Sequence, residues 1–209
     1  MTKLLETFAR ERVVVVIRGA EASTLGAVLR ALYEGGLRIF EVTVEAPGAI
    51  EAFSSVRSQM PDDALLGAGT VLDVGTAALV LAAGARFVVS PVLLKDVCDV
   101  ALAHGVPCVL GAMTPGEVHA AYRSGCEVVK VFPASAVGPG FLRELKGPLG
   151  FIPLYPTGGI TLENADTFLE AGAVALGVGS ALVKKAWVER GDWDALRGEA
   201  AAWAQFRRV

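Results

Sequence analysis

The sequence contains few of the residues that metal and disulfide sites require. Only 2 histidines and 3 cysteines occur in 209 residues, and the cysteines form no CxxC pair. Because Cys98, Cys108 and Cys126 are odd in number, at least one thiol stays unbridged, which indicates reduced cysteines in a cytoplasmic protein. We expect these thiols to be small core residues. His104 and His119 stand apart from any cluster of His, Asp or Glu, so we expect no metal.

The sequence also has no strong excess of charge of one sign and no long apolar run. The chain carries 19 Lys+Arg against 22 Asp+Glu, a net charge of -3, with no charge block. This balance excludes the basic footprint of a nucleic-acid-binding protein. The longest strongly apolar stretch, Ala171–Val183, is interrupted by glycine and is shorter than the about 20 residues of a membrane-spanning helix. Charged residues precede the first apolar run, so we expect no secretory signal and no membrane partner.

The residues that are abundant indicate a folded domain. The composition is 53% hydrophobic and 20% charged, with 24 glycines, which excludes intrinsic disorder. A chain of this length buries roughly 70% of its unfolded surface, enough for an independent core. No linker or low-complexity segment divides the sequence, so we expect residues 1–209 to form one domain.

Short β-branched runs alternate with longer segments rich in alanine and leucine. The expected strands are Val13–Ile17, Arg38–Thr43, Ala64–Gly67, Arg86–Ser90, Pro107–Leu110, Val128–Phe132, Phe151–Tyr155 and Val174–Val178. Helical segments between them include Ser23–Tyr33, Asp73–Ala82, Thr114–Arg123 and Leu162–Glu170. Alternation of this kind predicts parallel strands with right-handed crossovers.

Eight such units predict an α/β fold, a single-domain (β/α)8 TIM barrel with short loops. A doubly wound open sheet is the main alternative. Polar residues lie at or near the carboxyl end of nearly every expected strand. A barrel would bring these residues together at one mouth, whereas an open sheet would spread them along an edge. They are Arg18, Glu41 with Thr43, Thr70, Ser90, Lys130, Thr157 and Ser180.

Lys130 is the most informative of these residues. It is the one charged side chain in the strand Val128–Phe132, where period-2 alternation puts it on the face opposite Val129 and Val131. Loss of hydration favours a neutral amine, and a neutral lysine can attack a carbonyl carbon to form a Schiff base. The alternatives are a lysine that reaches past the strand end to solvent and a structural pairing with a carboxylate.

Glu41 and Arg18 are candidates for supporting roles. Schiff-base chemistry needs a group that moves protons, and a carboxylate such as Glu41 beside Lys130 supplies one. Its alternative role is a buried ion pair with Lys130 or Arg18. Arg18 ends the first strand, where a guanidinium can bind a carboxylate through two parallel hydrogen bonds. Without other context, the sequence favours a surface arginine that caps a neighbouring helix.

Two glycine-rich segments have the pattern of phosphate-binding loops. Pro156–Thr161 follows the seventh expected strand and Gly177–Ala181 follows the eighth. Glycine permits close backbone approach, and barrels frequently bind phosphate with these last two loops. The segment Gly67–Thr70 follows the third strand and can add a hydroxyl and amides to the same mouth.

Together these motifs resemble the bacterial class I 2-keto-3-deoxy-6-phosphogluconate (KDPG) and 4-hydroxy-2-oxoglutarate (KHG) aldolase family. The resemblance spans essentially the whole chain, and the lysine segment with Pro-Thr-Gly-Gly is its specific part. It is carried by Glu41-Val42-Thr43, Gly67-Ala68-Gly69-Thr70-Val71, Val89-Ser90-Pro91, Lys130-Val131-Phe132-Pro133-Ala134, Pro156-Thr157-Gly158-Gly159-Ile160 and Gly179-Ser180.

The resemblance implies a role for each matching residue. Lys130 is the Schiff-base lysine and Glu41 the carboxylate that moves protons. Thr70 and Arg18 would bind the pyruvyl carboxylate, and Phe132 and Thr157 would line the pyruvate pocket. Gly158, Gly159 and Ser180 would bind the phosphate. The full set of expected substrate contacts is Arg18, Thr43, Thr70, Pro91, Phe132, Thr157, Gly158, Gly159, Gly179 and Ser180. It also implies a phosphorylated keto acid as substrate, a homotrimer and no metal. Many members have arginine where this chain has Glu45.

Two functions of other classes fit the same residues. A phosphosugar isomerase or epimerase would use the phosphate loops with Glu41 as the base and form no covalent intermediate. A non-catalytic phosphosugar sensor would keep the anion site without turnover, but nothing in the sequence resembles an effector domain, so we do not expect a sensor.

Overall fold

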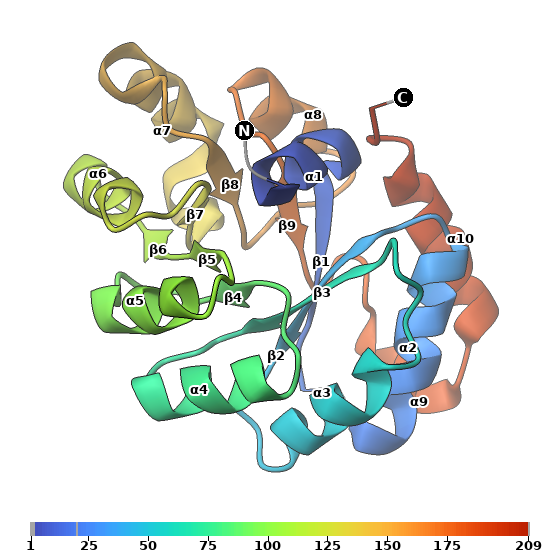
Figure 1. Cartoon of the computed structure of the whole chain (residues 1–209). Helices are drawn as coiled ribbons and strands as arrows, with labels where there is room; N and C mark the ends of the chain where they lie inside the picture. The colour runs from blue at the N-terminus through green and yellow to red at the C-terminus, as the bar shows by residue number, and fades with distance from the viewer. Residues whose placement is uncertain (1–2, 20, 209) are drawn as a thin grey trace.

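Helices and strands alternate along the chain, as the sequence predicts. The computed structural model describes residues 3–19 and 21–208, and it shows an α/β fold (Figure 1). The strands are β1 (Val13–Ile17), β2 (Ile39–Thr43), β3 (Leu65–Gly69), β4 (Val88–Val89), β5 (Cys108–Val109), β6 (Gly111–Ala112), β7 (Val129–Val131), β8 (Leu154–Pro156) and β9 (Leu176–Val178). The helices are α1 (Lys3–Glu11), α2 (Ala22–Glu34), α3 (Ala49–Arg57), α4 (Val74–Ala82), α5 (Lys95–Ala103), α6 (Pro115–Arg123), α7 (Ala134–Leu149), α8 (Ala165–Glu170), α9 (Lys185–Arg190) and α10 (Trp193–Ala204).

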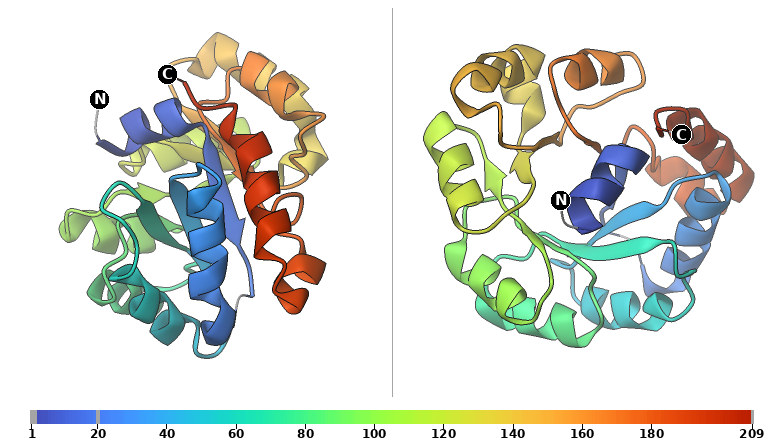
Figure 2. Two further views of the ribbon diagram at one scale, coloured as in Figure 1. Left: turned by 90° about the vertical axis from the view of Figure 1, so that its right-hand side faces the viewer. Right: turned by 45° about the horizontal axis from the view of Figure 1, so that its top comes forward.

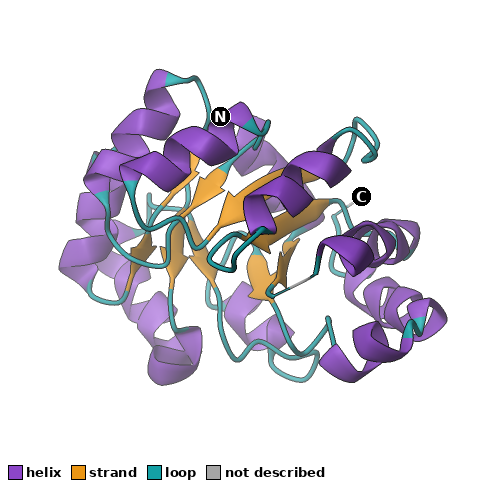
Figure 3. Ribbon diagram, turned by 90° about the horizontal axis from the view of Figure 1, so that it is seen from below, coloured by secondary structure: helices purple, strands orange, loops and turns teal. Residues whose placement is uncertain are grey.

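All paired strands run parallel and form two sheets. The larger has the order β5-β4-β3-β2-β1-β9, and the smaller has the order β6-β7-β8. Single parallel bridges, Leu154 with Ala173 and Thr157 with Gly177, link β8 to the segment around β9. The strands lie inside a surround of helices, which Figure 3 shows from below. Parallel sheets need this cover because both of their faces are buried.

The expected fifth strand, Pro107–Leu110, is present as β5, which pairs with β4. A further short strand that was not expected, β6, begins directly after Leu110 and pairs with β7. These two consecutive strands therefore belong to different sheets. The seventh expected strand, Phe151–Tyr155, corresponds to β8, which starts later than expected, at Leu154. Phe151 is exposed, and Pro153 has no N–H to donate to a neighbouring strand.

Side-chain alternation divides the core into two layers. Val129 and Val131 of β7 belong to the layer between the strands and the helices. Val128, which directly precedes β7, belongs to the inner layer together with Tyr155 and Val109. The predicted faces of this strand are thereby confirmed. Helix α1 lies across the centre of the helical surround (right view of Figure 2), and its Phe8 ring contacts the Tyr155 ring edge-on at 5.4 Å.

The C-terminal helix α10 lies beside α2, far from it in sequence (left view of Figure 2). The two helices approach closely at Gly35, where a Cβ atom would overlap Ala200. Trp203 of α10 is fully buried. Among the described residues, no helix combines the length and the apolar character needed to cross a membrane.

Candidate active site

Lys130 and Glu41 meet inside the fold, although 89 residues separate them. The Lys130 Nζ donates to Glu41 Oε1 at 3.0 Å and lies 3.4 Å from Oε2. Lys130 is 3% exposed and Glu41 0%. A lysine that reaches to solvent past the strand end is therefore excluded, and the partner of Glu41 is Lys130 rather than Arg18. A buried pair keeps both charges compensated at a place where either alone would be strongly destabilising.

Tyr155 completes this network and was missed by the sequence reasoning. Its hydroxyl donates to Glu41 Oε2 at 3.1 Å, and Tyr155 stands beside Lys130 in the register of β7 and β8. Burial, and secondly the Glu41 carboxylate, raise the pKa of the Tyr155 hydroxyl well above 10. The signal for Tyr155 was its spacing, because a residue two before Thr157 shares the face of that threonine.

Glycine in β3 provides the space for the Glu41 carboxylate. A Cβ atom at Gly69 would overlap Oε1 of Glu41, so any other residue there would displace the carboxylate from Lys130. A Cβ atom at Gly177 of β9 would in the same way overlap the hydroxyl of Thr157. Close approach, rather than backbone flexibility, explains these two glycines.

Two buried threonines point unpaired hydroxyls into the fold. Thr43 ends β2 on the same face as Glu41, and Thr157 follows β8. Neither Oγ1 has a hydrogen-bond partner among the described residues. Buried polar groups are normally paired, so these hydroxyls are available for a ligand at the carboxyl ends of the strands.

Thr70 lies at the same end in an unusual backbone conformation. Its φ of 58° is in the left-handed region. A β-branched residue rarely adopts this conformation, which costs of order 1–3 kcal/mol and is commonly found at functional sites. Phe132 places its ring centroid 5.5 Å from Lys130 Nζ, and the backbone of Pro91 contacts Gly111, where a Cβ atom would not fit.

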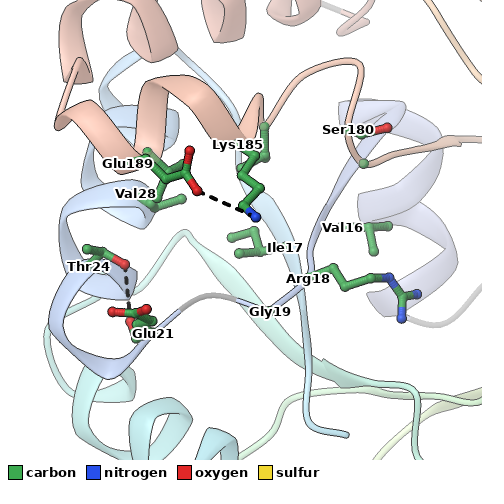
Figure 4. A pocket seen from close by; sticks show the side chains of 13 residues that line it. Val16, Ile17, Arg18, Gly19, Glu21, Thr24, Val28, Ser180, Lys185 and Glu189 are labelled. Atoms are coloured by element: carbon green, nitrogen blue, oxygen red, sulfur yellow. Dashed lines mark hydrogen bonds and ion pairs between the residues drawn. The ribbon is translucent and has the colours of Figure 1, made fainter. Parts of the chain in front are cut away.

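A cavity of about 740 Å³ opens between the ends of β1 and β9 and helices α2 and α9. Its lining includes Arg18, Gly19, Gly179, Ser180 and Lys185 (Figure 4), whereas Lys130 and Glu41 are not part of it. The two glycine-rich loops differ in this respect. Gly179 and Ser180 of one loop line the cavity, whereas Gly158 and Gly159 of the other do not. Both of those glycines have positive φ, 99° and 74°.

The cations around this cavity already have carboxylate partners. Arg18 Nη1 donates to Glu45 Oε1 at 2.7 Å, and Lys185 Nζ lies 3.5 Å from Glu189 Oε1. The Arg18 and Glu45 side chains are 57% and 34% exposed, so water screens the pair. An anionic ligand therefore has to compete with Glu45 for Arg18.

Potential metal-ligating side chains do not gather at this site. Within residues 3–19 and 21–208, the one group of three or more such side chains is Cys98, Cys108 and Cys126. Neither Lys130 nor Glu41 is part of that group.

Comparison with known proteins gives a uniform result. The family model "KDPG and KHG aldolase" matches residues 5–198. The 2-dehydro-3-deoxy-phosphogluconate aldolase of Treponema pallidum is 37% identical over 92% of this chain and 92% of its own length. The KHG/KDPG aldolase of Escherichia coli K12 is 34% identical over 87% and 84%.

A solved structure agrees with these relatives. The KDPG aldolase of Legionella pneumophila, with pyruvate captured as a covalent carbinolamine intermediate, superposes with a TM-score of 0.89 at 30% identity, covering 96% of this chain and 98% of that one. The match of fold, family model and relatives extends over nearly the full length. The chain is an aldolase and belongs to the KDPG and KHG aldolase family.

Proposed function

We propose that this enzyme cleaves 2-keto-3-deoxy-6-phosphogluconate to pyruvate and glyceraldehyde 3-phosphate through a Schiff base on Lys130. We extend the proposal to 4-hydroxy-2-oxoglutarate, which yields pyruvate and glyoxylate. The observation that carries it is the buried contact of 3.0 Å between the Lys130 amine and the Glu41 carboxylate. A nucleophile within hydrogen-bond reach of a proton acceptor is the arrangement that covalent catalysis requires.

The reaction follows from these two groups. Lys130 first passes a proton to Glu41, and the neutral amine attacks the C2 ketone to form a carbinolamine, whose hydroxyl leaves as water when Glu41 returns that proton. The resulting iminium accepts the electron pair of the C3–C4 bond as the C4 hydroxyl gives its proton to the Glu41 carboxylate and the aldehyde departs. Glu41 then protonates the remaining enamine at C3, and hydrolysis releases pyruvate and the free lysine. We propose that no metal takes part, because the iminium itself withdraws the electrons.

The pyruvyl end of the substrate is assigned to the strand ends around Lys130. We place the Thr70 amide and hydroxyl at the carboxylate, and Thr43, Pro91, Phe132 and Thr157 around the remaining atoms. The unpaired Thr43 and Thr157 hydroxyls support this assignment.

We assign the phosphate to Ser180 and Gly179, with Gly158 and Gly159 on the neighbouring loop. Arg18 lines the same cavity as Ser180. This position favours a contact between Arg18 and the phosphate over the contact with the pyruvyl carboxylate that the sequence predicted.

Borohydride reduction in the presence of pyruvate, followed by peptide mass mapping, tests the chemistry. A pyruvyl adduct on Lys130 supports the Schiff base and its site. An adduct on another lysine keeps the reaction class and refutes the site. No adduct on folded protein contradicts the proposal.

Replacing Ser180 with alanine tests the phosphate site. We expect KM for the phosphorylated substrate to rise roughly tenfold to a hundredfold, because a hydrogen bond to a charged group contributes about 1.5–3 kcal/mol. Steady-state kinetics with 4-hydroxy-2-oxoglutarate, which has no phosphate, serves as the control and should change little. Equal losses for both substrates would contradict the phosphate role.

Replacing Glu45 with glutamine tests the competition for Arg18. The variant frees the guanidinium, and we expect KM for the phosphorylated substrate to fall by up to about fivefold, since exposed ion pairs contribute about 0.2–1 kcal/mol. Glu51→Gln on the exposed side of α3 is the matched control for the lost charge. An unchanged KM in Glu45→Gln would show that substrate does not engage Arg18.

We further propose that the strands close into a single-domain (β/α)8 barrel. The two bridges between β8 and the segment around β9 join the two sheets on one side. On the other side, only Leu110 separates β5 of the larger sheet from β6 of the smaller one, so the chain itself joins the sheets there. The three free thiols support a reducing, cytoplasmic location.

A homotrimer is our proposal for the assembly. Large apolar side chains are exposed near α4 and the loops that follow β3 and β4, among them Leu79 (57%), Leu72 (51%) and Val92 (48%). Exposed apolar side chains gathered in one region indicate a protein contact. We expect three copies by light scattering and a shift to monomer in Leu79→Lys; a monomeric parent enzyme would contradict the proposal.

A further inference from the structure

Three cysteine side chains from different elements meet behind the sheet. Cys98 lies on α5, Cys108 begins β5, and Cys126 lies between α6 and β7. Each is at most 1% exposed, and their sulfur atoms all lie within 4.8 Å of one another, with Cys98 and Cys126 separated by 3.8 Å. The cluster could not be predicted from local sequence patterns, because the three residues are far apart along the chain.

The spacing of the sulfurs suits one shared ion. With one edge of 3.8 Å and the other two at most 4.8 Å, the centre of the sulfur triangle lies about 2.6 Å or less from each sulfur, near the length of a metal–thiolate bond of about 2.3 Å. No fourth Cys, His, Asp or Glu among the described residues joins the group. Three-coordinate binding is therefore favoured over the tetrahedral site that zinc prefers.

Charge selects the kind of ion. Three thiolates around a divalent ion leave a net negative charge, which is costly to bury without a partner. Lys95 of the same helix is engaged with Asp99 at 2.6 Å on the surface. A trivalent ion bound by three thiolates is neutral and suits the surrounding apolar core.

We propose that Cys98, Cys108 and Cys126 form a binding site for a trivalent thiophilic metalloid, with arsenite as the representative ligand. Arsenous acid, As(OH)3, reacts with the three thiols to form three As–S bonds and release three waters. Each sulfur gives up its proton to a departing hydroxyl, and no atom changes its oxidation state.

A surface cavity provides the approach to this site. The cavity has a volume of about 470 Å³ and is lined by Gly125, Cys126 and Glu127 together with Tyr122 and Phe151. Since Cys126 lines it, a small movement of the adjoining turn exposes the thiols. Neither Lys130 nor Glu41 belongs to the cysteine group or lines this cavity, so arsenite binding does not require the catalytic residues.

Native mass spectrometry of the full chain with arsenite, under a phosphine reductant, tests this site. We expect one arsenic per chain with the loss of three hydrogens, and three sulfur neighbours by X-ray absorption. Cys98→Ala, Cys108→Ala and Cys126→Ala should each weaken binding at least tenfold, with circular dichroism to confirm folding. Unchanged binding in any folded single variant, or no adduct on the folded parent, would overturn the proposal.

A second inference concerns Tyr155, and it rests on the proposed function. Glu41 contacts two titratable groups among the described residues, Lys130 through Oε1 and Tyr155 through Oε2. The Tyr155 ring is fixed by Phe8, and its hydroxyl remains protonated at neutral pH. We infer that Tyr155 is a positioning residue, which holds the carboxylate toward Lys130 and stabilises its ionised form.

Tyr155→Phe removes this hydrogen bond with little change in volume. We expect kcat to fall about tenfold with KM nearly unchanged, since a hydrogen bond to a charged group contributes about 1.5–3 kcal/mol. We also expect the acid limb of the pH–rate profile to move to higher pH, because the hydrogen bond favours the charged carboxylate. Tyr33→Phe, which loses an exposed hydrogen bond to Asp63, is the control.

The outcomes separate this inference from the proposed function. If parent enzyme forms no pyruvate adduct, the Schiff-base proposal fails. If the adduct forms and Tyr155→Phe keeps the parent kcat and pH profile, the positioning role fails, even where the variant loses stability.

Discussion

Substitution of Lys130 by alanine is expected to abolish cleavage of both keto acids. The amine forms the covalent bond to C2, and no other group with a printed hydrogen bond to Glu41 is an amine that can form a Schiff base. Losing the nucleophile of a covalent mechanism typically lowers kcat by several orders of magnitude, and on the order of 10⁶ in one well-studied hydrolase. Pyruvate release measured by a coupled assay, with borohydride trapping in parallel, checks the result.

Stability has to be controlled because Lys130 is half of a buried pair. Removing one partner of such a pair costs about 3–5 kcal/mol, since the other charge stays buried. Lys130→Met with Glu41→Gln removes both charges at similar volume, and we expect this double variant to fold and remain inactive. Lys130→Arg should also be inactive, because a guanidinium stays protonated. Turnover near the parent rate in any of these would refute the assignment.

Local pattern was enough to predict the strand–helix alternation and the faces of the lysine strand. Lys130 is the one charged residue in that expected strand, and alternation assigned it to the face opposite Val129 and Val131. Parallel strands bring their carboxyl ends to one side, so the meeting of Lys130 and Glu41 followed from topology. Their distance and the pairing partner did not, because register between strands remote in sequence depends on the packing of the whole fold.

Other features needed the folded chain. The extra strand β6 after Leu110 reflects a change of pairing partner, from β4 to β7, that no local sequence pattern encodes. The Arg18–Glu45 pair joins two loops, and the three cysteines come from three elements. In each case the contact is between residues far apart in sequence, where propensity and periodicity carry no information.

The glycines of β3 and β9 show how strand sequence serves the site. Gly69 and Gly177 are poor strand residues by propensity, and yet each lies opposite a side chain of the proposed site, Glu41 or Thr157. Their missing Cβ atoms leave the volume that those side chains occupy. The resemblance singled out Gly69 as part of a motif, and the structure supplies the physical reason for it.

Glu41→Gln is expected to lower kcat/KM by about 10²–10⁴, the usual contribution of a positioned acid–base group. The amide is nearly isosteric and can still accept from Lys130 or Tyr155, so the variant removes proton transfer with little change in packing. We expect slow but site-specific trapping of pyruvate on Lys130, because the nucleophile remains while dehydration of the carbinolamine loses its proton donor.

Glu11→Gln is the matched control for Glu41→Gln. Glu11 is another buried glutamate, 4% exposed, and it pairs with Arg10 at 2.8 Å and Arg207 at 3.2 Å, away from the site. Its neutralisation should lower the thermal midpoint and leave kcat/KM unchanged. If Glu41→Gln retained parent kcat/KM, or if Glu11→Gln lost as much activity as Glu41→Gln, proton transfer by Glu41 would be excluded and its role would reduce to holding the charge of Lys130.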